Sequence, residues 1–435
     1  MRQRKSSFTI LSAIERFLER ESAGGFLLFG SAVIAMVLAN TALSQGYFDF
    51  WHTEAGLAVG SFELKMSLGH WINDGLMAIF FLVIGLEIKR ELMVGELSSV
   101  SKAAFPAVAA LGGMIAPALI YFTLNMGADG NPDGFGIPMA TDIAFALGFL
   151  MLLGKRVPLA LKVFLVSLAV IDDLGAIVVI AIFYSSSVDW SSMLWAAAIV
   201  AVLIGLGRLG VRNLGVYILL GVVLWYFVYQ SGIHTTIAGV ALALTIPVRQ
   251  RISSQSFVDT CQLELETFGQ AEHKRKNILL SSEQQDALEK IGEAYTQVQN
   301  PLVRLEHALH PFSAFLIMPL FALANAGVVV GGGSLSFLQP VSLGIIIGLL
   351  IGKPLGIIGL SFIADRLGWC CKPASVSWRQ LIGVGMLGGV GFTMSIFITQ
   401  LAFTDDGVIS SAKLAILAAS LLAGLAGVLY LWRRR

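Results

Sequence analysis

The chain has 435 residues, of which 56% are hydrophobic and only 13% are charged. Such a composition excludes an ordinary soluble globular domain and is typical of a protein that crosses a membrane many times. The formal net charge of +1 argues against a nucleic-acid partner.

The first 23 residues combine basic side chains with apolar residues at helical spacing. This pattern predicts a short amphipathic helix that lies on the inner membrane surface. The first apolar run begins only at Gly24 and has the length of a membrane span. We therefore expect no cleavable signal peptide.

Twelve apolar stretches have the length of membrane-spanning helices, although the seventh and eighth are separated by almost nothing and their division is open. We expect eight spans in residues 24–248, a cytoplasmic loop at 249–301 and four spans in 302–435. The stretches are residues 24–43, 71–94, 103–124, 135–153, 159–184, 190–207, 213–229, 231–248, 302–330, 340–363, 380–402 and 409–432.

The distribution of charge gives the predicted orientation. Most basic residues between spans fall on the side of the N-terminus, whereas the other side carries mainly aspartate and glutamate. The positive-inside rule then places both termini in the cytoplasm. Cys261, Cys370 and Cys371 would also lie there, where thiols stay reduced, so we expect neither a disulfide nor a metal framework.

Two loops are long enough to form structure of their own. In the outer loop, residues 44–70, an alternating run around Gly60 and Ser61 predicts a small β-hairpin, which would serve as a dimer contact or as a lid. In the inner loop, 249–301, a capping-box pattern at 282–285 precedes a heptad-like apolar stripe. That stripe is compatible with a helix on the inner membrane face or with a partner-binding coiled coil.

Two adjacent aspartates, Asp172 and Asp173, lie in the middle of the fifth stretch. A carboxylate there costs about 2.5 to 3.5 kcal/mol on biological insertion scales, so the pair indicates function rather than packing. Neighbouring helical residues point about 100° apart. One aspartate can therefore meet a fixed counter-charge while the other faces a cavity open to water or an ion.

Two stretches, one in each half of the chain, look interrupted. Residues 138–142 place Thr141 or Asp142 as an N-cap inside the membrane, and glycines crowd residues 383–391 of the eleventh stretch. A pair of broken spans indicates the binding site of a transporter. In the tenth stretch, Lys353 is a lone cation that should find an acid, and Asp172 or Asp173 is available.

Four motifs together resemble the bacterial sodium/proton antiporter family typified by NhaA. The resemblance implies an all-α polytopic membrane protein of about twelve transmembrane helices, with inverted-topology repeats, two broken helices that cross at the midplane and a small outer β-hairpin. It also implies a bacterial inner-membrane homodimer that contacts its partner through residues 44–70. The motifs are ATDIAFA at 140–146, IDDLGAI at 171–177, GKPLG at 352–356 and LEHALHP at 305–311.

The resemblance assigns roles to the residues of the central site. Asp173 corresponds to the primary ligand of a transient Na⁺ or Li⁺, and Asp172 to the residue that pairs with Lys353 in the ion-free state. Thr141 and Asp142 match the crossing of the broken helices. No cofactor is implied.

Other roles implied by the resemblance belong to residues near the membrane surfaces. Asp74 matches an acid of the outer funnel, although a helix cap is an equally good interpretation. The residues that match a pH response could also be ordinary interfacial charges or, at the histidine that starts the eighth stretch, a packed residue. They are Glu87, Glu91, His234, Glu306, His307 and His310.

These features predict an electrogenic Na⁺(Li⁺)/H⁺ antiporter that expels sodium at alkaline pH, by competition of cation and proton for the aspartate site. The alternatives are a sodium-coupled symporter of an organic anion and a membrane channel or sensor. An enzyme is disfavoured, because the sequence shows no nucleophile and base pattern and no structural metal pattern.

Overall fold

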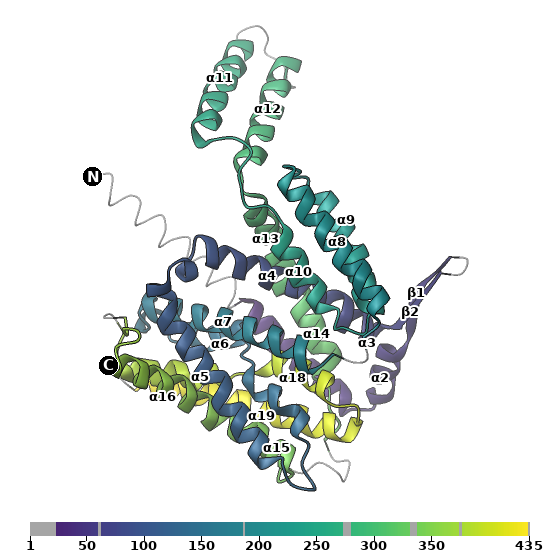
Figure 1. The fold of residues 1–435 in the computed structure, drawn as a ribbon, viewed down its shortest axis with the longest axis vertical. Helices are drawn as coiled ribbons and strands as arrows, with labels where there is room; N and C mark the ends of the chain where they lie inside the picture. The colour runs from purple at the N-terminus through teal and green to yellow at the C-terminus, as the bar shows by residue number, and fades with distance from the viewer. Residues whose placement is uncertain are drawn as a thin grey trace.

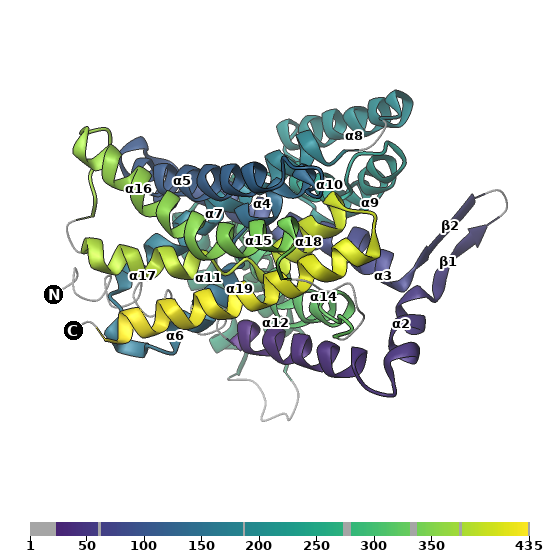
Figure 2. The ribbon, with the colours of Figure 1, turned by 90° about the horizontal axis from the view of Figure 1, so that it is seen from below.

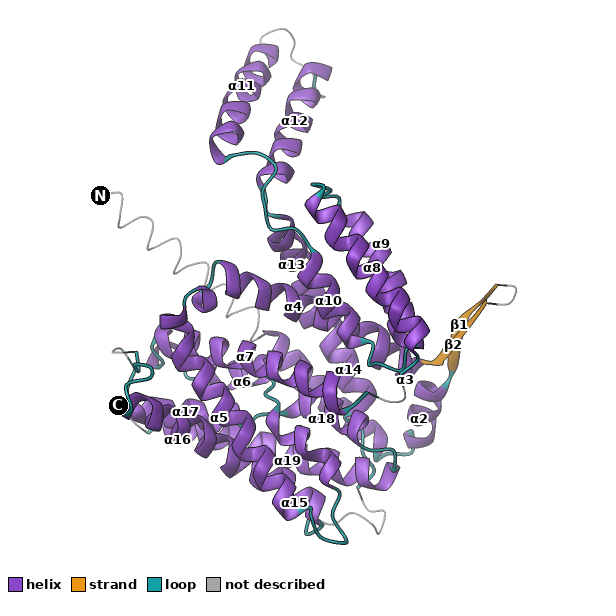
Figure 3. Cartoon of the chain, viewed as in Figure 1, coloured by secondary structure: helices purple, strands orange, loops and turns teal. Residues whose placement is uncertain are grey.

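The computed structural model describes residues 23–59, 62–185, 188–272, 280–330, 337–373 and 376–433. Within these ranges the chain is mainly helical, with a two-stranded sheet at its periphery (Figures 1 and 3). The predicted N-terminal amphipathic lead falls on residues 1–22, outside the described part of the chain.

The first half of the chain alternates long helices with short 3₁₀ and π segments. Its elements are the helix Ala23–Ala39, α2 (Ser44–His52), β1 (Glu54–Val59), β2 (Phe62–Ser67), α3 (Leu68–His70), the π-helix η1 (Trp71–Leu76), α4 (Met77–Met93), η2 (Glu96–Ser98), α5 (Val100–Leu124), the 3₁₀-helix η3 (Pro132–Met139), α6 (Ile143–Met151), η4 (Gly154–Arg156), α7 (Leu159–Phe183), α8 (Trp190–Arg208), α9 (Leu214–Gln230) and α10 (Thr236–Thr245).

The second half begins with two helices of the inner loop and then returns to apolar helices. Its elements are α11 (Ser254–Glu272), α12 (Ser282–Val298), α13 (Pro301–Phe312), the π-helix η5 (Ser313–Ile317), α14 (Met318–Asn325), α15 (Pro340–Ile347), the π-helix η6 (Gly348–Gly352), α16 (Lys353–Arg366), α17 (Trp378–Gly388), α18 (Phe392–Ala402) and α19 (Asp406–Trp432).

In the described residues, eight helices are long and apolar enough to cross a membrane, or up to ten if two bent pairs each form one span. The pairs are Ala23–Ala39 with α2, bent by 114°, and α17 with α18, bent by 45°. Of the predicted spans, α9 has 17 residues and α10 only 10. At about 1.5 Å per residue α10 covers half of a ~30 Å hydrocarbon core. The count of twelve stays a prediction.

Two hydrophobic cores meet at α4. Phe81 and Ile84 pack into the larger core, which includes α5 to α7 and α14 to α19. Leu82 and Leu86 pack into the smaller one, with α8 to α10 and the start of α13. In Figure 2, α5, α16, α17 and α19 run side by side. The aspartates of α7 are therefore enclosed by helices from both halves of the chain.

In the described part of the chain, two of the three π-helices are explained by a nearby proline. In η6 the Lys353 N–H bonds to the Gly348 carbonyl five residues back, and in η5 the Met318 N–H bonds likewise to Ser313. In both cases the residue that donates this N–H is directly followed by a proline: Pro354 follows Lys353, and Pro319 follows Met318. Because proline lacks an N–H and its ring crowds the carbonyl four residues before it, the preceding turn widens.

The two long loops both form hairpins. β1 and β2 pair antiparallel from Glu54–Ser67 to Val59–Phe62, as the alternating pattern predicts, and the turn residues 60 and 61 lie outside the described part. The inner loop contains two helices where one was expected. The capping box of α12 uses Ser281 with Gln284, one residue before the predicted start.

Candidate functional site

The two aspartates of α7 are buried side by side and have different partners. Asp172 Oδ2 accepts hydrogen bonds from Lys353 Nζ and from Thr141 Oγ1, each at 2.7 Å. Asp173 is only 3% exposed, and its Oδ1 has no hydrogen-bond partner among the described residues. Asp172 Oδ1 likewise has no partner among the described residues, so the two carboxylates differ in their surroundings: Asp172 is paired with a cation, and Asp173 lines a cavity.

Lys353 reaches Asp172 because it opens α16 directly after the π turn η6. The side chain is fully buried, and its ammonium also donates to the carbonyl oxygen of Met139. Met139 is the last residue of η3, where the chain leaves helical conformation and its carbonyl has no helical partner. The ammonium therefore joins the tenth predicted span to the broken fourth one.

The break in the fourth predicted span lies at residues 140–142. Ala140 and Asp142 have extended backbones, and Asp142 is the N-cap of α6, with Oδ1 accepting from the Phe145 N–H at 3.0 Å. Thr141 Oγ1 also lies 3.0 Å from the carbonyl oxygen of Gly388 at the end of α17. This extended stretch supplies backbone and side-chain oxygens next to the aspartates.

The second break touches the first. The Asp142 N–H donates to the carbonyl oxygen of Val390 at 2.7 Å, and Asp142 Oδ2 accepts from the Thr393 N–H at 3.2 Å and from the Thr393 hydroxyl. Ser395 Oγ donates to the Ile137 carbonyl oxygen at 2.7 Å. Residues 140–142 and 390–395 are therefore held together by bonds through both backbone and side chains.

A cavity of about 70 Å³ adjoins Asp173, Asp142 and Thr141. Glu87 of α4 and His310 of α13 line the same cavity. A volume of this size holds one or two water molecules or a partly hydrated monovalent cation. The cavity thus connects the unpartnered aspartate to residues that the sequence places near the cytoplasmic surface.

Among the predicted pH-response residues, Glu306 and Glu91 share one arginine. Arg90 Nε lies 3.3 Å from Glu306 Oε1, and Arg90 Nη2 lies 3.1 Å from Glu91 Oε1. Glu306 is buried and its Oε2 has no partner among the described residues. His307, on the same helix as Glu306, is exposed. These residues form a group separate from the aspartate pair.

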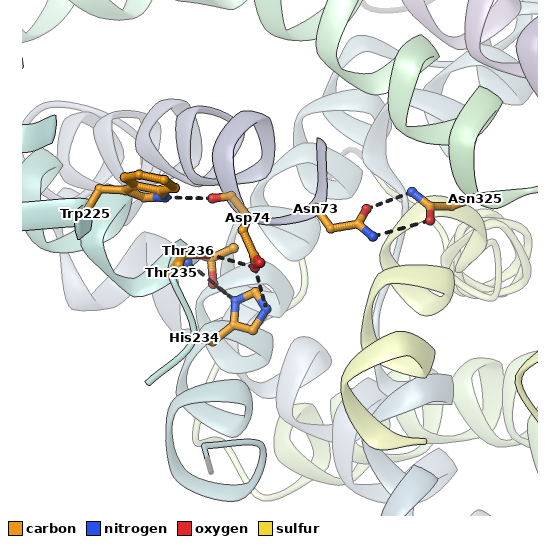
Figure 4. A network of polar contacts seen from close by, with 7 residues as sticks. All are labelled: Asn73, Asp74, Trp225, His234, Thr235, Thr236 and Asn325. Atoms are coloured by element: carbon orange, nitrogen blue, oxygen red, sulfur yellow. Dashed lines mark hydrogen bonds and ion pairs between the residues drawn. The ribbon is translucent and has the colours of Figure 1, made fainter. Parts of the chain in front are cut away.

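Asp74 and His234 form a third group, shown in Figure 4. Asp74 Oδ1 lies 3.7 Å from His234 Nε2 and accepts from Thr235 Oγ1 at 3.1 Å. Trp225 Nε1 donates to the Asp74 carbonyl oxygen at 2.8 Å, and His234 Nδ1 lies 3.0 Å from Thr236 Oγ1. The η1 segment is thereby fastened to the turn between α9 and α10.

Sequence reasoning assigned no role to an amide cluster beside this group. Asn325 Nδ2 donates to Asn73 Oδ1 at 2.8 Å, and Gln400 Nε2 donates to Asn325 Oδ1 (Figure 4 shows the asparagine pair). It also assigned none to Lys89, whose ammonium contacts the carbonyl oxygens of Leu244 at 2.6 Å and Ile246 at 2.5 Å. The sequence signal that could have identified these residues is that an amide or an ammonium group inside an apolar stretch is energetically costly and therefore needs a polar partner.

The chain is similar to known sodium/proton antiporters over nearly its whole length. The family described as Na⁺/H⁺ antiporter 1 matches residues 15–431. A Na⁺/H⁺ antiporter NhaA of Wolinella succinogenes is 53% identical over 97% of this chain and 93% of its own length. NhaA 2 of Helicobacter hepaticus is 51% identical over 97% and 95%, and an NhaA of Helicobacter pylori is 52% identical over 99% and 98%.

Proposed function

The chain belongs to the Na⁺/H⁺ antiporter 1 family and is an integral membrane transporter that exchanges Na⁺ for H⁺, and we propose that both ions use the Asp173 carboxylate. The observation that supports this proposal is that the two adjacent aspartates of α7 have different surroundings. Asp172 is paired with Lys353 and Thr141, whereas Asp173 lines the cavity.

Exchange follows from competition for that carboxylate. A hard cation such as Na⁺ or Li⁺ needs several oxygen ligands, and Thr141, Asp142 and the carbonyls at the chain breaks lie beside Asp173. A proton neutralises the same carboxylate. Because an unneutralised charge is costly in the membrane, only the cation-loaded or protonated form changes its exposure between the two sides.

Lys353 makes the exchange electrogenic in this proposal. When the cation draws Asp172 into its ligand shell, the ammonium loses its 2.7 Å partner and releases a proton, so more positive charge moves as protons than as sodium. The membrane potential then drives sodium out of the cell. A Lys353→Ala variant that still exchanges should do so without response to the potential.

We also propose that exchange is activated at alkaline pH through residues on the cytoplasmic side. Glu87 and His310 line the cavity, and the Arg90 ion pairs with Glu306 and Glu91 lie beyond it. Histidine changes charge in the relevant pH range. This applies to His307 on α13 and also to His234, which lies 3.7 Å from Asp74 and would act from the outer funnel rather than from the cavity. Deprotonation would change the charge around the cavity entrance and so the access of sodium to Asp173.

The proposed setting is the bacterial inner membrane, with both termini in the cytoplasm and no cofactor. We propose a homodimer in which residues 44–70 contact the partner. The β1–β2 pair projects from the body (Figure 1), and a two-stranded sheet has two edge strands at which a second copy can add a strand. Membrane lipid surrounds the apolar helices.

A sodium-coupled symporter would need a cationic group for its organic anion. Lys353, the mid-span cation that the sequence offers for that purpose, is paired with Asp172 instead. A channel would pass current without a stoichiometric counterflow of protons. The placement of Lys353 therefore favours antiport over symport, and the measurement of proton counterflow distinguishes antiport from a channel.

The deciding experiment measures the collapse of a pH gradient in proteoliposomes on addition of Na⁺, Li⁺ or K⁺. We expect Na⁺ and Li⁺ to alkalinise an acid-loaded lumen with wild-type protein and to have no effect with Asp173→Asn. Lys162→Gln, on the same helix but outside the site, is the matched control and should retain exchange. Undiminished exchange by Asp173→Asn would reject the proposed site.

A further inference from the structure

Helices α11 and α12 form a two-helix arm that projects from the body of the molecule (Figure 1). The helices are antiparallel, because Glu264 pairs with Lys290 at 3.2 Å while Gln284 Nε2 donates to the Phe268 carbonyl oxygen at 3.4 Å. At the base, the Arg251 N–H donates to the Gln297 carbonyl oxygen at 2.9 Å. That bond closes the arm where it joins α13.

One side of this arm is apolar. Four exposed apolar residues lie on it, and each directly follows a residue that packs between the two helices or borders their contact. Val258 (44% exposed) and Leu265 (60%) follow Phe257 and Glu264 on α11; Leu288 (46%) and Tyr295 (54%) follow Ala287 and Ala294 on α12.

These four residues share one side because of helical geometry. A step of one residue turns each helix by about 100° from the contact face. In two antiparallel helices, equal steps from their common contact lead to the same side of the pair. The register set by Glu264 and Lys290 also brings Leu265 level with Leu288 and Val258 level with Tyr295. We call this surface the arm face.

In the middle of the arm, charge is confined to its other sides. Between 255 and 269 and between 285 and 295, the remaining positions beside the four apolar residues are glutamine or glycine: Gln255, Gln262, Gly269, Gln285 and Gly292. The acidic residues Asp259, Glu266, Asp286, Glu289 and Glu293 fall at other helical angles. An added Cβ at Gly269 or Gly292 would meet nothing within 4 Å, so these positions are open to close approach.

We propose that the arm face binds the arm face of a second copy of this chain, which forms an inner dimer contact distinct from residues 44–70. An identical partner carries the same acids, so its other faces repel this arm and only the uncharged face is compatible with itself. Two-fold symmetry requires a self-complementary patch, and an apolar patch of this kind satisfies that requirement. An anionic membrane surface would be repelled by the acidic sides but attracted by Lys274, Arg275 and Lys276 in the sequence between α11 and α12, and cross-linking distinguishes a membrane contact from a second copy.

Cross-linking tests the contact directly. In a background with Cys261, Cys370 and Cys371 replaced by serine, Leu288→Cys and Tyr295→Cys are treated in native membranes with a short bis-maleimide. We expect a covalent dimer from both variants and none from Glu289→Cys, which lies one residue beyond Leu288 on an acidic side. Equal cross-linking of Glu289→Cys, or none from the arm-face variants, would overturn the proposal.

A charge substitution tests the energetic contribution, and the chain supplies a matched control. Leu263 and Leu265 are exposed to 61% and 60% on the same helix, but Leu263 lies on another side. Leu265→Glu should weaken dimerisation by on the order of tenfold in lipid bicelles, because two new charges face each other across the two-fold axis. Leu263→Glu should leave it unchanged, and equal effects of the two would contradict the proposal.

The result is separable from the proposed ion exchange. Leu263→Glu and Leu265→Glu lie on α11, which projects from the body, whereas Asp173 lies on α7 within it (Figure 1). We therefore expect both variants to retain sodium exchange in proteoliposomes, which is measured in parallel. A wild type that dimerises through the arm but exchanges no sodium would reject the transport site alone. A wild type that exchanges sodium as a monomer would reject the arm contact alone.

Discussion

At the scale of residues, Asp172 and Asp173 show how a step of one residue along a helix gives two side chains different roles. Both are buried on α7, yet only Asp172 contacts Lys353 and Thr141, while Asp173 lines the cavity. The separation follows from the ~100° step between helical neighbours. A pair spaced by three or four residues would instead face the same partner.

The Asp172–Lys353 pair carries a stability prediction. Lys353→Ala leaves a buried carboxylate without its cation, a change that typically costs about 3 to 5 kcal/mol. We expect a clear fall in the thermal midpoint of the detergent-solubilised protein. Adding Asp172→Asn should recover part of the loss, because a neutral amide needs no counter-charge. Equal midpoints for Lys353→Ala and the control Lys162→Ala would contradict this expectation.

At the scale of elements, the close approach of α5 and α16 positions Lys353. A Cβ placed on Gly356 would collide with the backbone of Gly112, and one placed on Gly112 with Gly356. Small residues at such crossings allow the backbones of membrane helices to approach each other. Because α16 begins at Lys353, this contact also fixes the depth at which the ammonium meets Asp172.

This crossing gives a second stability prediction with its control on the same helix. Gly356→Val should displace α16, lower the thermal midpoint and reduce Na⁺-driven exchange, since overpacking typically costs at least about 1 to 3 kcal/mol. Gly359→Val, three residues later, meets nothing within 4 Å and should change neither measurement. If both variants behaved alike, helix propensity rather than the crossing would be the cause.

At the scale of the whole molecule, the charge pattern predicts which loops face the cytoplasm. Cys371 follows α16 and is exposed, and Asp129, in the loop before η3, is exposed on the opposite side in the predicted topology. With Cys371 as the sole cysteine, a membrane-impermeant maleimide should label inverted vesicles and not right-side-out ones. Asp129→Cys in a cysteine-free background should show the reverse, and the same sidedness for both would refute the orientation.

Much of the site was predictable because its parts carry local signals. Asp142 follows an extended Pro-containing stretch and precedes a clean helical run, which predicts the N-cap that the structure shows. A single lysine in an apolar span predicts a nearby acid, because an unpaired charge is costly in the membrane. In the structure this acid is Asp172. The outer strands were likewise predictable from alternation around a turn.

Other contacts had no local signal. The ammonium of Lys89 caps the end of α10, about 150 residues away in the chain, by donating hydrogen bonds to three backbone carbonyl oxygens. Asn73, Asn325 and Gln400 come from three distant segments and meet only after α14 and α18 have packed beside η1. Their polarity was visible in the sequence, whereas their partners were not.

The sequence by itself determined the membrane class, the aspartate pair, the lone lysine and the two chain breaks, because hydropathy, buried charge and glycine or proline act within one segment. Only the tertiary structure decided that the two breaks bond through Asp142 and Thr393 and that the inner loop folds back on itself as two helices, and it brings Lys353 to Asp172, the partner that the resemblance implies. Those outcomes depend on packing between residues that lie up to 251 positions apart, which no local pattern encodes.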